Sequence, residues 1–516
     1  MVLRSWKRAG DSMEQNTSNI VRSTLAVAVI SLLLKGLGFL EKVLQAYFFG
    51  TNPELDAYLV ALGVVLALFL IIRELVEPGF LRVFMEALSA GDREGAWSLF
   101  NSIGLLIFLV VAAVVTIAMV FPELAINLFA PGFTGEKRNL AVALTRLTLP
   151  AALFLSLSAL TYITLNGMKR FALPASGDLA FKGGIIVALV LLYKPIGIWC
   201  VVWGIVAGAF FRLLVHMSHL WRRVSFKNIR FGSPRVKAMQ RLTVPLFFGV
   251  LFAQISGLVD IAVASYLADG SIAALSYAKK IVDVPILLFP YVLSIIIFPY
   301  FSQLAIEKKE PELSRLLSRS VQWIVFVFLP LSLLLLILAT PIVQVLLQRG
   351  AFDAASTRMT SGPTSIYALG MVAFAVETII VQFFFACADT KTPVIVGIIC
   401  VLVNIVLTLL LMRILAHNGI ALALVVSKSL KVLVLLKLVG GKVARARVVT
   451  RGPLLKCCLS AAVMGLVVFV LHVIAWESFS GDLAASLAYL AICFTAGGLI
   501  YLTVSWLLGL KGDLVH

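Results

Sequence analysis

The chain has 516 residues and a formal net charge of +18; 61% of its residues are hydrophobic, 13% are charged, and the mean hydropathy is +1.05. So few charged groups cannot cover the surface of a water-soluble protein of this length, which excludes a soluble globular protein. The chain is therefore expected to lie in a lipid bilayer.

Long apolar stretches recur along the whole chain. A membrane-spanning helix needs about 20 apolar residues because the hydrocarbon core is about 30 Å thick. The stretches are continuously apolar instead of alternating, which predicts helices and not barrel strands. We predict fourteen spans, near 21–49, 54–83, 97–121, 139–166, 175–193, 195–216, 236–268, 272–304, 313–340, 362–387, 391–413, 418–438, 453–474 and 483–510. The predicted fold class is an all-α polytopic membrane protein.

Residues recur weakly at a constant offset of 219 positions. Examples are Gly38 and Gly257, Glu41 and Asp260, Tyr47 and Tyr266, Tyr58 and Tyr277, Phe133 and Phe352, and Pro174 and Pro393. A constant offset over such a length indicates an internal duplication. We predict two six-helix parallel repeats, related by a pseudo-two-fold axis along the membrane normal, and two additional C-terminal helices. Duplicated transporters usually hold a site between their halves and move one half against the other.

The repeats divide the chain into five predicted segments. These are a cytoplasmic N-terminal segment (1–20), an N-terminal six-helix lobe (21–216), a basic cytoplasmic linker (217–235), a C-terminal six-helix lobe (236–438) and two further transmembrane helices (453–510).

The distribution of Lys and Arg predicts the orientation, because positive residues in short loops are retained on the cytoplasmic side. With the N-terminus inside, the predicted cytoplasmic segments carry 27 Lys and Arg residues and the outer loops carry 6. We therefore expect both termini to be cytoplasmic. The net positive charge follows from this topology, and the basic linker has too few interleaved aromatic residues to indicate a nucleic-acid partner.

Ten cationic residues lie inside the predicted spans or at their rims: Lys35, Lys42, Arg73, Arg146, Lys182, Arg212, Lys279, Lys280, Lys428 and Lys431. Four of them are close enough to the cytoplasmic helix ends to extend into water, and we expect them to do so; these are Lys182, Arg212, Lys428 and Lys431. A charge near the bilayer centre costs at least about 2.5 to 3.5 kcal/mol. The first three residues and the Lys279-Lys280 pair are therefore expected to face a wet cavity or a partner.

Acidic residues occur at the same depths as these cations: Glu41, Asp56, Glu74, Glu77, Asp260, Asp283 and Glu377. Lys35 and Lys42 are seven positions apart and share one face of the first helix. If the repeats face one another, the first helices of the two repeats and their neighbours enclose a cationic cavity. An alternative is that Glu41 with Lys42, and Arg73 with Glu77, only neutralise each other within helices.

Several motifs resemble those of one transporter family. The most specific are Gln348-Arg349-Gly350-Ala351-Phe352 and Asp389-Thr390-Lys391-Thr392-Pro393; Lys35-Gly36-Leu37-Gly38-Phe39 and the stretch 278–285 support them in order. Over roughly residues 20 to 440 the chain is similar to the MurJ/MviN lipid II flippases of the MOP superfamily.

The resemblance implies an alternating-access transporter of the bacterial inner membrane, whose basic cavity meets the pyrophosphate of an undecaprenyl-pyrophosphate-linked sugar. Matching positions are Lys35, Asp56, Glu77 and Lys280, the last paired nearby with Asp283. With the cavity residues above, the predicted substrate-binding set is Lys35, Glu41, Lys42, Asp56, Arg73, Glu77, Lys280 and Asp283. We expect a monomer in the lipid bilayer.

The chain departs from the family pattern at charged positions. Glu41-Lys42 stands where the family has Arg followed by Asp, and Ile72 occupies the position of an Arg. Lys35 and Lys280 replace arginines, which keeps a point charge but loses the bidentate fork suited to phosphate. These changes leave open a cargo of exopolysaccharide or O-antigen units, and a MATE-type multidrug exporter is a further alternative.

Enzymatic chemistry is not expected. The five histidines do not form a catalytic or metal-binding group, so we predict no catalytic residues, no metal site and no cofactor. Transport can depend on the membrane potential or on a coupling ion. Asn404 and Thr408, one turn apart, can offer oxygens to sodium, although a simple hydrogen-bonded pair is the preferred interpretation.

Overall fold

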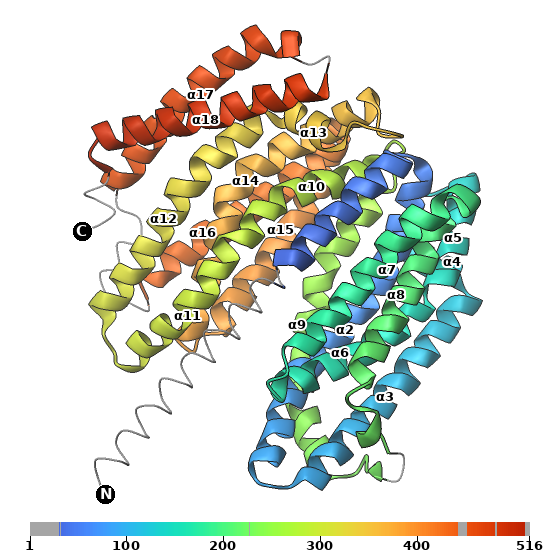
Figure 1. Ribbon diagram of the computed structural model, residues 1–516. Helices are drawn as coiled ribbons and strands as arrows, with labels where there is room; N and C mark the ends of the chain where they lie inside the picture. Colours follow the sequence, from blue (N-terminus) through green and yellow to red (C-terminus); the bar gives the residue numbers. More distant parts are fainter. Residues whose placement is uncertain (1–29, 31, 226–227, 442–450, 480–481, 511–516) are drawn as a thin grey trace, which may run out of the picture. The chain divides into compact units, whose positions relative to one another are not determined.

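The computed structural model describes residues 30, 32–225, 228–441, 451–479 and 482–510 (Figure 1). Within these ranges every regular element is a helix and there is no strand, which confirms the all-α fold class. Twelve helices are long and apolar enough to cross a membrane. The other two predicted spans are 21–49, which begins outside the described residues, and 236–268, in which only Gln254–Ala264 is identified as a short apolar helix. The count of fourteen therefore stays a prediction.

The helices of the first repeat follow one another with short connections. They are a helix over 32–49, α2 (Pro53–Ser89), α3 (Arg93–Val120), α4 (Pro122–Phe129), α5 (Gly135–Thr148), α6 (Pro150–Gly167), α7 (Ala172–Ile196) and α8 (Trp199–Met217). A short 3-10 helix, η1 (Trp221–Arg223), lies in the linker that follows.

The second repeat has the same order. It contains α9 (Pro234–Ala264), α10 (Ser271–Leu288), α11 (Pro290–Ile306), α12 (Glu310–Ile337), α13 (Ala339–Leu347), α14 (Ala354–Ala386), α15 (Lys391–Leu415) and α16 (His417–Val439). Two further helices, α17 (Arg451–Phe479) and α18 (Leu483–Leu507), pack against each other, and α17 also lies against α12 (Figure 1).

The helix boundaries repeat at the offset found in the sequence. Adding 219 to the bounds of α7 gives 391–415, which are the bounds of α15. The backbone repeats as well: Lys169 and Ala388 have φ of 61° and 57°, and Gly197 and Ala416 have φ of 56° and 50°. The duplication is therefore present in the local backbone structure as well as in the matching residues of the sequence.

The repeats differ where only one of them contains a proline. The predicted span 139–166 is divided, because α5 ends at Thr148 and α6 begins at Pro150, whose ring cannot continue a helix hydrogen-bond ladder. The equivalent position in α14 is Leu369, and that helix is continuous. In the same way Pro290 separates α10 from α11 within the predicted span 272–304. The short helices α4 and α13 were not predicted.

Small residues allow α7 and α8 to touch along their backbones. Gly204 and Gly208 are four positions apart on α8 and so share one face. A Cβ atom on Gly208 would lie 2.6 Å from the carbonyl oxygen of Phe181 on α7. Small residues at this spacing are a common means of close packing between membrane helices. Here the packing brings Asp178 of α7 next to Arg212 of α8.

The chain forms two compact units that alternate along the sequence. Unit 1 contains the described residues up to Leu44 together with Ala61–Ala125 and Ala141–Val250; unit 2 contains Gln45–Val60, Ile126–Leu140 and the described residues from Leu251 onward. Two short segments from the first repeat therefore pack with the second repeat in unit 2.

Candidate functional site

Glu41 and Lys182 form an ion pair inside unit 1. Glu41 lies on the helix over 32–49 and is 4% exposed. Its Oε2 atom is 2.5 Å from the Nζ atom of Lys182 on α7, whose side chain is 32% exposed. The alternative in which Glu41 serves only its neighbour Lys42 is therefore wrong, because its carboxylate binds a lysine from another helix.

A second ion pair joins α7 to α8. Arg212 is 7% exposed, and its Nη2 atom is 3.0 Å from Oδ1 of Asp178. The Arg212 guanidinium carbon also lies 5.5 Å from the ring centroid of Phe69 and 5.9 Å from that of Tyr162. Aromatic faces attract cations at these separations, so the arginine is held by a carboxylate and two rings.

Arg73 belongs to the same neighbourhood. Its Nε atom is 3.5 Å from Oε2 of Glu77, one turn away on α2, so these two residues do neutralise each other within one helix, as the alternative above proposed. Arg73 also lies 5.4 Å from the centroid of the Tyr162 ring, which thus contacts two guanidinium groups. Lys35 and Lys42 are half-buried in the same unit.

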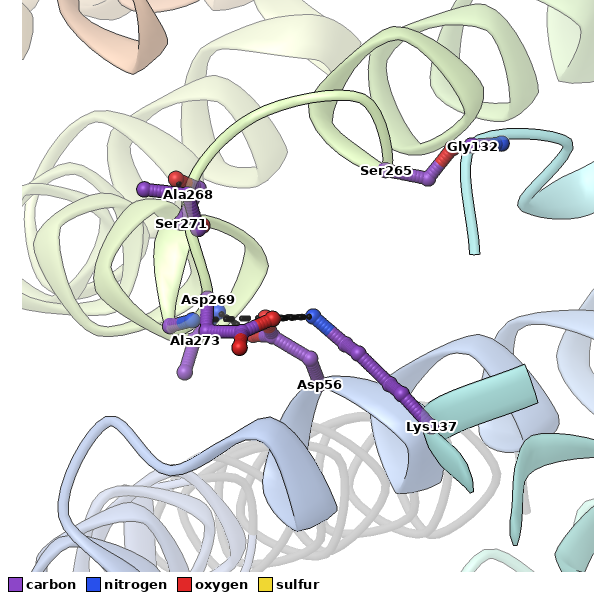
Figure 2. A network of polar contacts seen from close by, with 9 residues as sticks. Asp56, Gly132, Lys137, Ser265, Ala268, Asp269, Ser271 and Ala273 are labelled. Atoms are coloured by element: carbon purple, nitrogen blue, oxygen red, sulfur yellow. Dashed lines mark hydrogen bonds and ion pairs between the residues drawn. The ribbon is translucent and has the colours of Figure 1, made fainter. Parts of the chain in front are cut away.

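Asp56 is the centre of a polar cluster in unit 2. Its carboxylate is 1% exposed and accepts hydrogen bonds from Lys137 Nζ (2.8 Å), the Gly270 amide (2.7 Å) and the Ala273 amide (2.8 Å). Lys137 also pairs with Asp269 at 2.8 Å, as Figure 2 shows. Because α10 begins at Ser271, Asp56 supplies negative charge and hydrogen-bond acceptors to amides at the start of that helix, where the helix itself offers no acceptor.

Further bonds surround this Asp56 cluster, which we define as Asp56, Lys137, Asp269, Gly270 and Ala273. Tyr277 Oη donates to the Gly50 carbonyl at 3.1 Å, and the Ala351 amide donates to the Tyr47 carbonyl at 2.8 Å. The Gly132 amide donates to Ser265 Oγ at 2.9 Å (Figure 2). The segments 45–60 and 126–140 are thus tied to α10, to the residue that follows α9 and to the turn before α14 within unit 2.

A polar cavity of about 490 Å³ lies between α10, α11, α14 and α16 in unit 2. Its charged lining residues are Lys279, Asp283, Glu377, Lys428 and Lys431. Glu377 pairs with Lys428 at 3.1 Å and with Lys431 at 2.7 Å. Of the predicted substrate-binding residues, Asp283 lines this cavity. The α10 lysine that lines it beside Asp283 is Lys279. Lys280 lies half-buried on the same helix and is not among the lining residues.

A third group in unit 2 surrounds Asn404. Its Nδ2 atom donates to Asp260 Oδ1 and to Ser256 Oγ, both at 3.2 Å, and Ser427 Oγ donates to Asn404 Oδ1 at 3.2 Å. Thr408 lies beside the same Asp260 carboxyl. The helix that carries Asn404, α15, contains no acidic residue, and Asp260 of α9 supplies the carboxylate of this group. In the described part of the chain no group of three or more His, Cys, Asp or Glu residues is arranged to hold a metal ion.

The linker is bound to α3 in unit 1. Asn101 Nδ2 donates to the Arg223 carbonyl at 3.2 Å, and Ser98 Oγ donates to the Asn228 carbonyl at 2.7 Å. Asp92, which caps α3, pairs with Arg235. The hydrogen bond from the Gly95 amide, followed by that from Arg235, holds the pKa of Asp92 below its usual range.

Comparison with known proteins identifies the family. The sequence model described as "Lipid II flippase MurJ" matches residues 45–505, which is most of the chain. The chain belongs to the MurJ family.

Individual relatives agree with this assignment. A probable lipid II flippase MurJ of Rhizobium tropici is 27% identical, with 95% of each chain covered, and a lipid II flippase MurJ of Burkholderia cenocepacia is 25% identical over 81% of this chain and 83% of the relative. A solved MurJ structure in an inward closed conformation has a TM-score of 0.82 at 26% identity and covers 95% of this chain and 100% of that one. An inward-facing MATE transporter of the MOP superfamily, 13% identical with a TM-score of 0.68 over 84% of this chain and 98% of its own, shares the fold.

Within this MurJ family member, sequence reasoning missed part of the charge network. We expected Lys182, Arg212, Lys428 and Lys431 to extend into water. This is wrong for Arg212, which is 7% exposed, and all four pair with an acidic side chain inside a unit, which was not expected. Asp178 was overlooked, although it stands four positions before Lys182 on one helix face, a spacing that signals a shared environment. The cationic cavity enclosed by the first helices of the two repeats and their neighbours stays a prediction.

Proposed function

We propose that the protein moves lipid II, the undecaprenyl-pyrophosphate-linked peptidoglycan precursor, from the inner to the outer leaflet of the bacterial cytoplasmic membrane by alternating access. The proposal rests on family membership and on one structural observation. Cationic side chains lie inside apolar helices, where acids and aromatic rings hold them in defined positions; the paired Glu41 and Lys182 are the best example. A bilayer protein maintains such costly charges for a charged substrate or pathway.

The pyrophosphate of the cargo supplies the complementary charge. A phosphate oxygen binds ammonium and guanidinium groups through charge-assisted hydrogen bonds, which are stronger in a poorly solvated site than in water. Lys35, Lys42 and Arg73 in unit 1 are half-buried, so each keeps part of its surface accessible. Lys280 in unit 2 is a further proposed contact, and it is also half-buried.

The Asp56 cluster acts as a latch in this mechanism. Alternating access requires one side of the transporter to be closed while the other is open. From the positive-inside distribution we predict that Asp56, which follows the first span, lies on the outer side. Its buried carboxylate ties 45–60 and 126–140, which come from the first repeat, to the start of α10 in the second repeat, so a movement of one repeat against the other at this point would break these bonds.

The group around Asn404 is proposed as the site that couples transport to its energy source. Asp260, Ser256, Ser427 and Thr408 place a carboxylate and hydroxyl oxygens around one amide. Hard monovalent cations prefer such oxygen ligands. These oxygens would hold a cation whose gradient would drive the movement of the cargo, and an Asp260→Asn variant is expected to lose that dependence. Equal dependence of both proteins on the ion gradient would contradict the assignment.

The protein works as a monomer with both termini in the cytoplasm. Cysteine substitution at Arg230 in the linker, followed by labelling of intact cells, tests this orientation. An impermeant thiol reagent is expected to modify Arg230→Cys only after the cells are permeabilised. Modification of intact cells would contradict it.

Complementation tests the function in vivo. Expression in a bacterium depleted of its own lipid II flippase is expected to restore growth and cell shape. Lys35→Ala and Lys280→Ala variants that insert normally are expected to fail, and arginine at either position is expected to restore activity because it keeps the charge. Absence of rescue by the wild-type chain at normal membrane abundance would contradict the proposal.

A further inference from the structure

The cavity between α10, α11, α14 and α16 has a lining of unusual character for a membrane helix bundle. Besides three lysines and two carboxylates it presents the neutral hydrogen-bonding side chains of Ser294, Tyr367, Thr378 and Gln382. Its volume of about 490 Å³ falls within the roughly 300 to 1,000 Å³ of small-ligand sites. The site is therefore large enough for a polar ligand and equipped to orient one.

The charges in the cavity are of both signs. Lys279 and Asp283 come from α10, one turn apart, while Glu377 of α14 faces Lys428 and Lys431 of α16. A site for pyrophosphate alone needs an excess of cations, because carboxylates beside it repel the ligand. Two carboxylates among three lysines fit a ligand that itself carries a negative and a positive group.

A purely structural ion-pair network does not account for this arrangement. Glu377 and Lys431 have side chains that are only 14% and 20% exposed, so this pair serves as a fixed support. Lys428 is different: its side chain is 41% exposed, and its Nζ atom lies 5.1 Å from the Phe374 ring centroid on the cavity lining. Lys279 is likewise exposed at the lining. These two ammonium groups are placed to meet a ligand while Glu377 positions one of them.

We propose that this cavity binds the peptide portion of the lipid-linked cargo. A free carboxylate of the peptide pairs with Lys428 and Lys279, and a free amine of the peptide pairs with Asp283. This inference rests on the proposed function and extends it, since it makes the cavity the element that distinguishes peptide-bearing cargo from lipid-linked units made of sugar alone.

The test compares matched cargoes with the full-length protein in liposomes. Three undecaprenyl-pyrophosphate-linked disaccharides are used: one with its peptide, one with the peptide amine acetylated, and one with the peptide removed. Lys428→Gln is expected to lower transport of the peptide-bearing cargo by about tenfold at limiting concentration, the value of one hydrogen bond to a charged group, and to leave transport of the peptide-free cargo within about twofold. Asp283→Asn is expected to abolish the preference for the unacetylated amine.

Two variants control for folding. Lys437→Gln removes an exposed lysine from the same helix outside the cavity lining and is expected to transport all three cargoes like the wild type. Lys428→Arg keeps the charge and is expected to retain most of the preference for peptide. If Lys428→Gln does not fold, Thr378→Val changes the lining without breaking an ion pair and is expected to reduce the same preference.

The outcomes separate the inference from the proposed function. Wild-type transport of both peptide-bearing and peptide-free cargo, with equal losses in Lys428→Gln, would overturn the peptide site and leave the flippase function in place. Unchanged transport in Lys428→Gln and Asp283→Asn would overturn it as well. Failure of the wild type to transport any of the three cargoes would refute the proposed function, and the inference with it.

Discussion

Replacing the partners of the Glu41–Lys182 ion pair measures how strongly the charge network of unit 1 is held. Lys182→Gln leaves the 4% exposed Glu41 without its cation, whereas Glu41→Gln leaves Lys182, whose side chain is 32% exposed and reaches solvent more easily. Breaking a fully buried pair costs about 3–5 kcal/mol, and an exposed pair is worth about 0.2–1 kcal/mol. With one partner buried and the other one-third exposed, we expect a coupling energy of about 1–3 kcal/mol.

A double-mutant cycle supplies the measurement. The free energy of unfolding is determined by denaturant titration in mixed micelles for the wild type, Glu41→Gln, Lys182→Gln and the double variant, which is expected to be more stable than Lys182→Gln. The exposed Arg82–Glu86 pair of the same unit, with side chains 67% and 62% exposed, is the matched control and is expected to couple by at most about 0.5 kcal/mol. A Glu41–Lys182 coupling no larger than that of the control would refute the assignment of a buried, mutually dependent pair.

Three further perturbations address other parts of the molecule. Asp56→Asn is expected to speed hydrogen exchange at the first turn of α10 by about tenfold, because an N-terminal carboxylate is worth about 0.5–2 kcal/mol; unchanged exchange would argue against a latch. Gly208→Ala is expected to lower the thermal midpoint through a clash with α7, whereas Gly183→Ala, which adds a Cβ atom with no neighbour within 4 Å, is expected to be neutral; equal effects would exclude a specific backbone contact. The lowered pKa of Asp92 stabilises the linker attachment above the pKa of an unfolded aspartate, about 3.9, and the contribution is lost as pH falls through the folded value. A spin label at Gly232→Cys is therefore expected to gain mobility in acid, and a similar gain in an Asp92→Asn background would disprove the role of that carboxylate.

Much of the fold could be predicted because it depends on periodic and local signals. Continuous apolar stretches predicted the bodies of α7 and α15, and the observed bounds of the two helices follow the offset of 219 positions found in the sequence. Pro150 carried a signal for the start of α6 that the apolar pattern concealed, since the residues on both sides of it are hydrophobic. The short helices α4 and α13, of 8 and 9 residues, are below the length at which apolar periodicity is decisive.

The candidate site was less predictable, because its partners come from distant parts of the sequence. The depth of Lys182 and its position near a helix end suggested that it extends into water, and only the fold reveals Glu41, 141 positions away, as its partner. Asn404 was interpreted without a carboxylate because Asp260 lies on another helix. The alternative that paired Arg73 with Glu77 within one helix is confirmed, because the spacing of four residues fixes their separation.

Reconstituted transport tests the central claim most directly. Fluorescent lipid II is placed in both leaflets of liposomes that contain the purified protein, and the fraction accessible to an impermeant quencher is followed over time. A lipid II flippase is expected to make the inner-leaflet pool accessible at a rate that increases with the amount of protein and decreases in a well-folded Lys280→Ala variant. An inner-leaflet pool that stays protected as in protein-free liposomes, under conditions in which another MurJ family member translocates lipid II, would contradict the account.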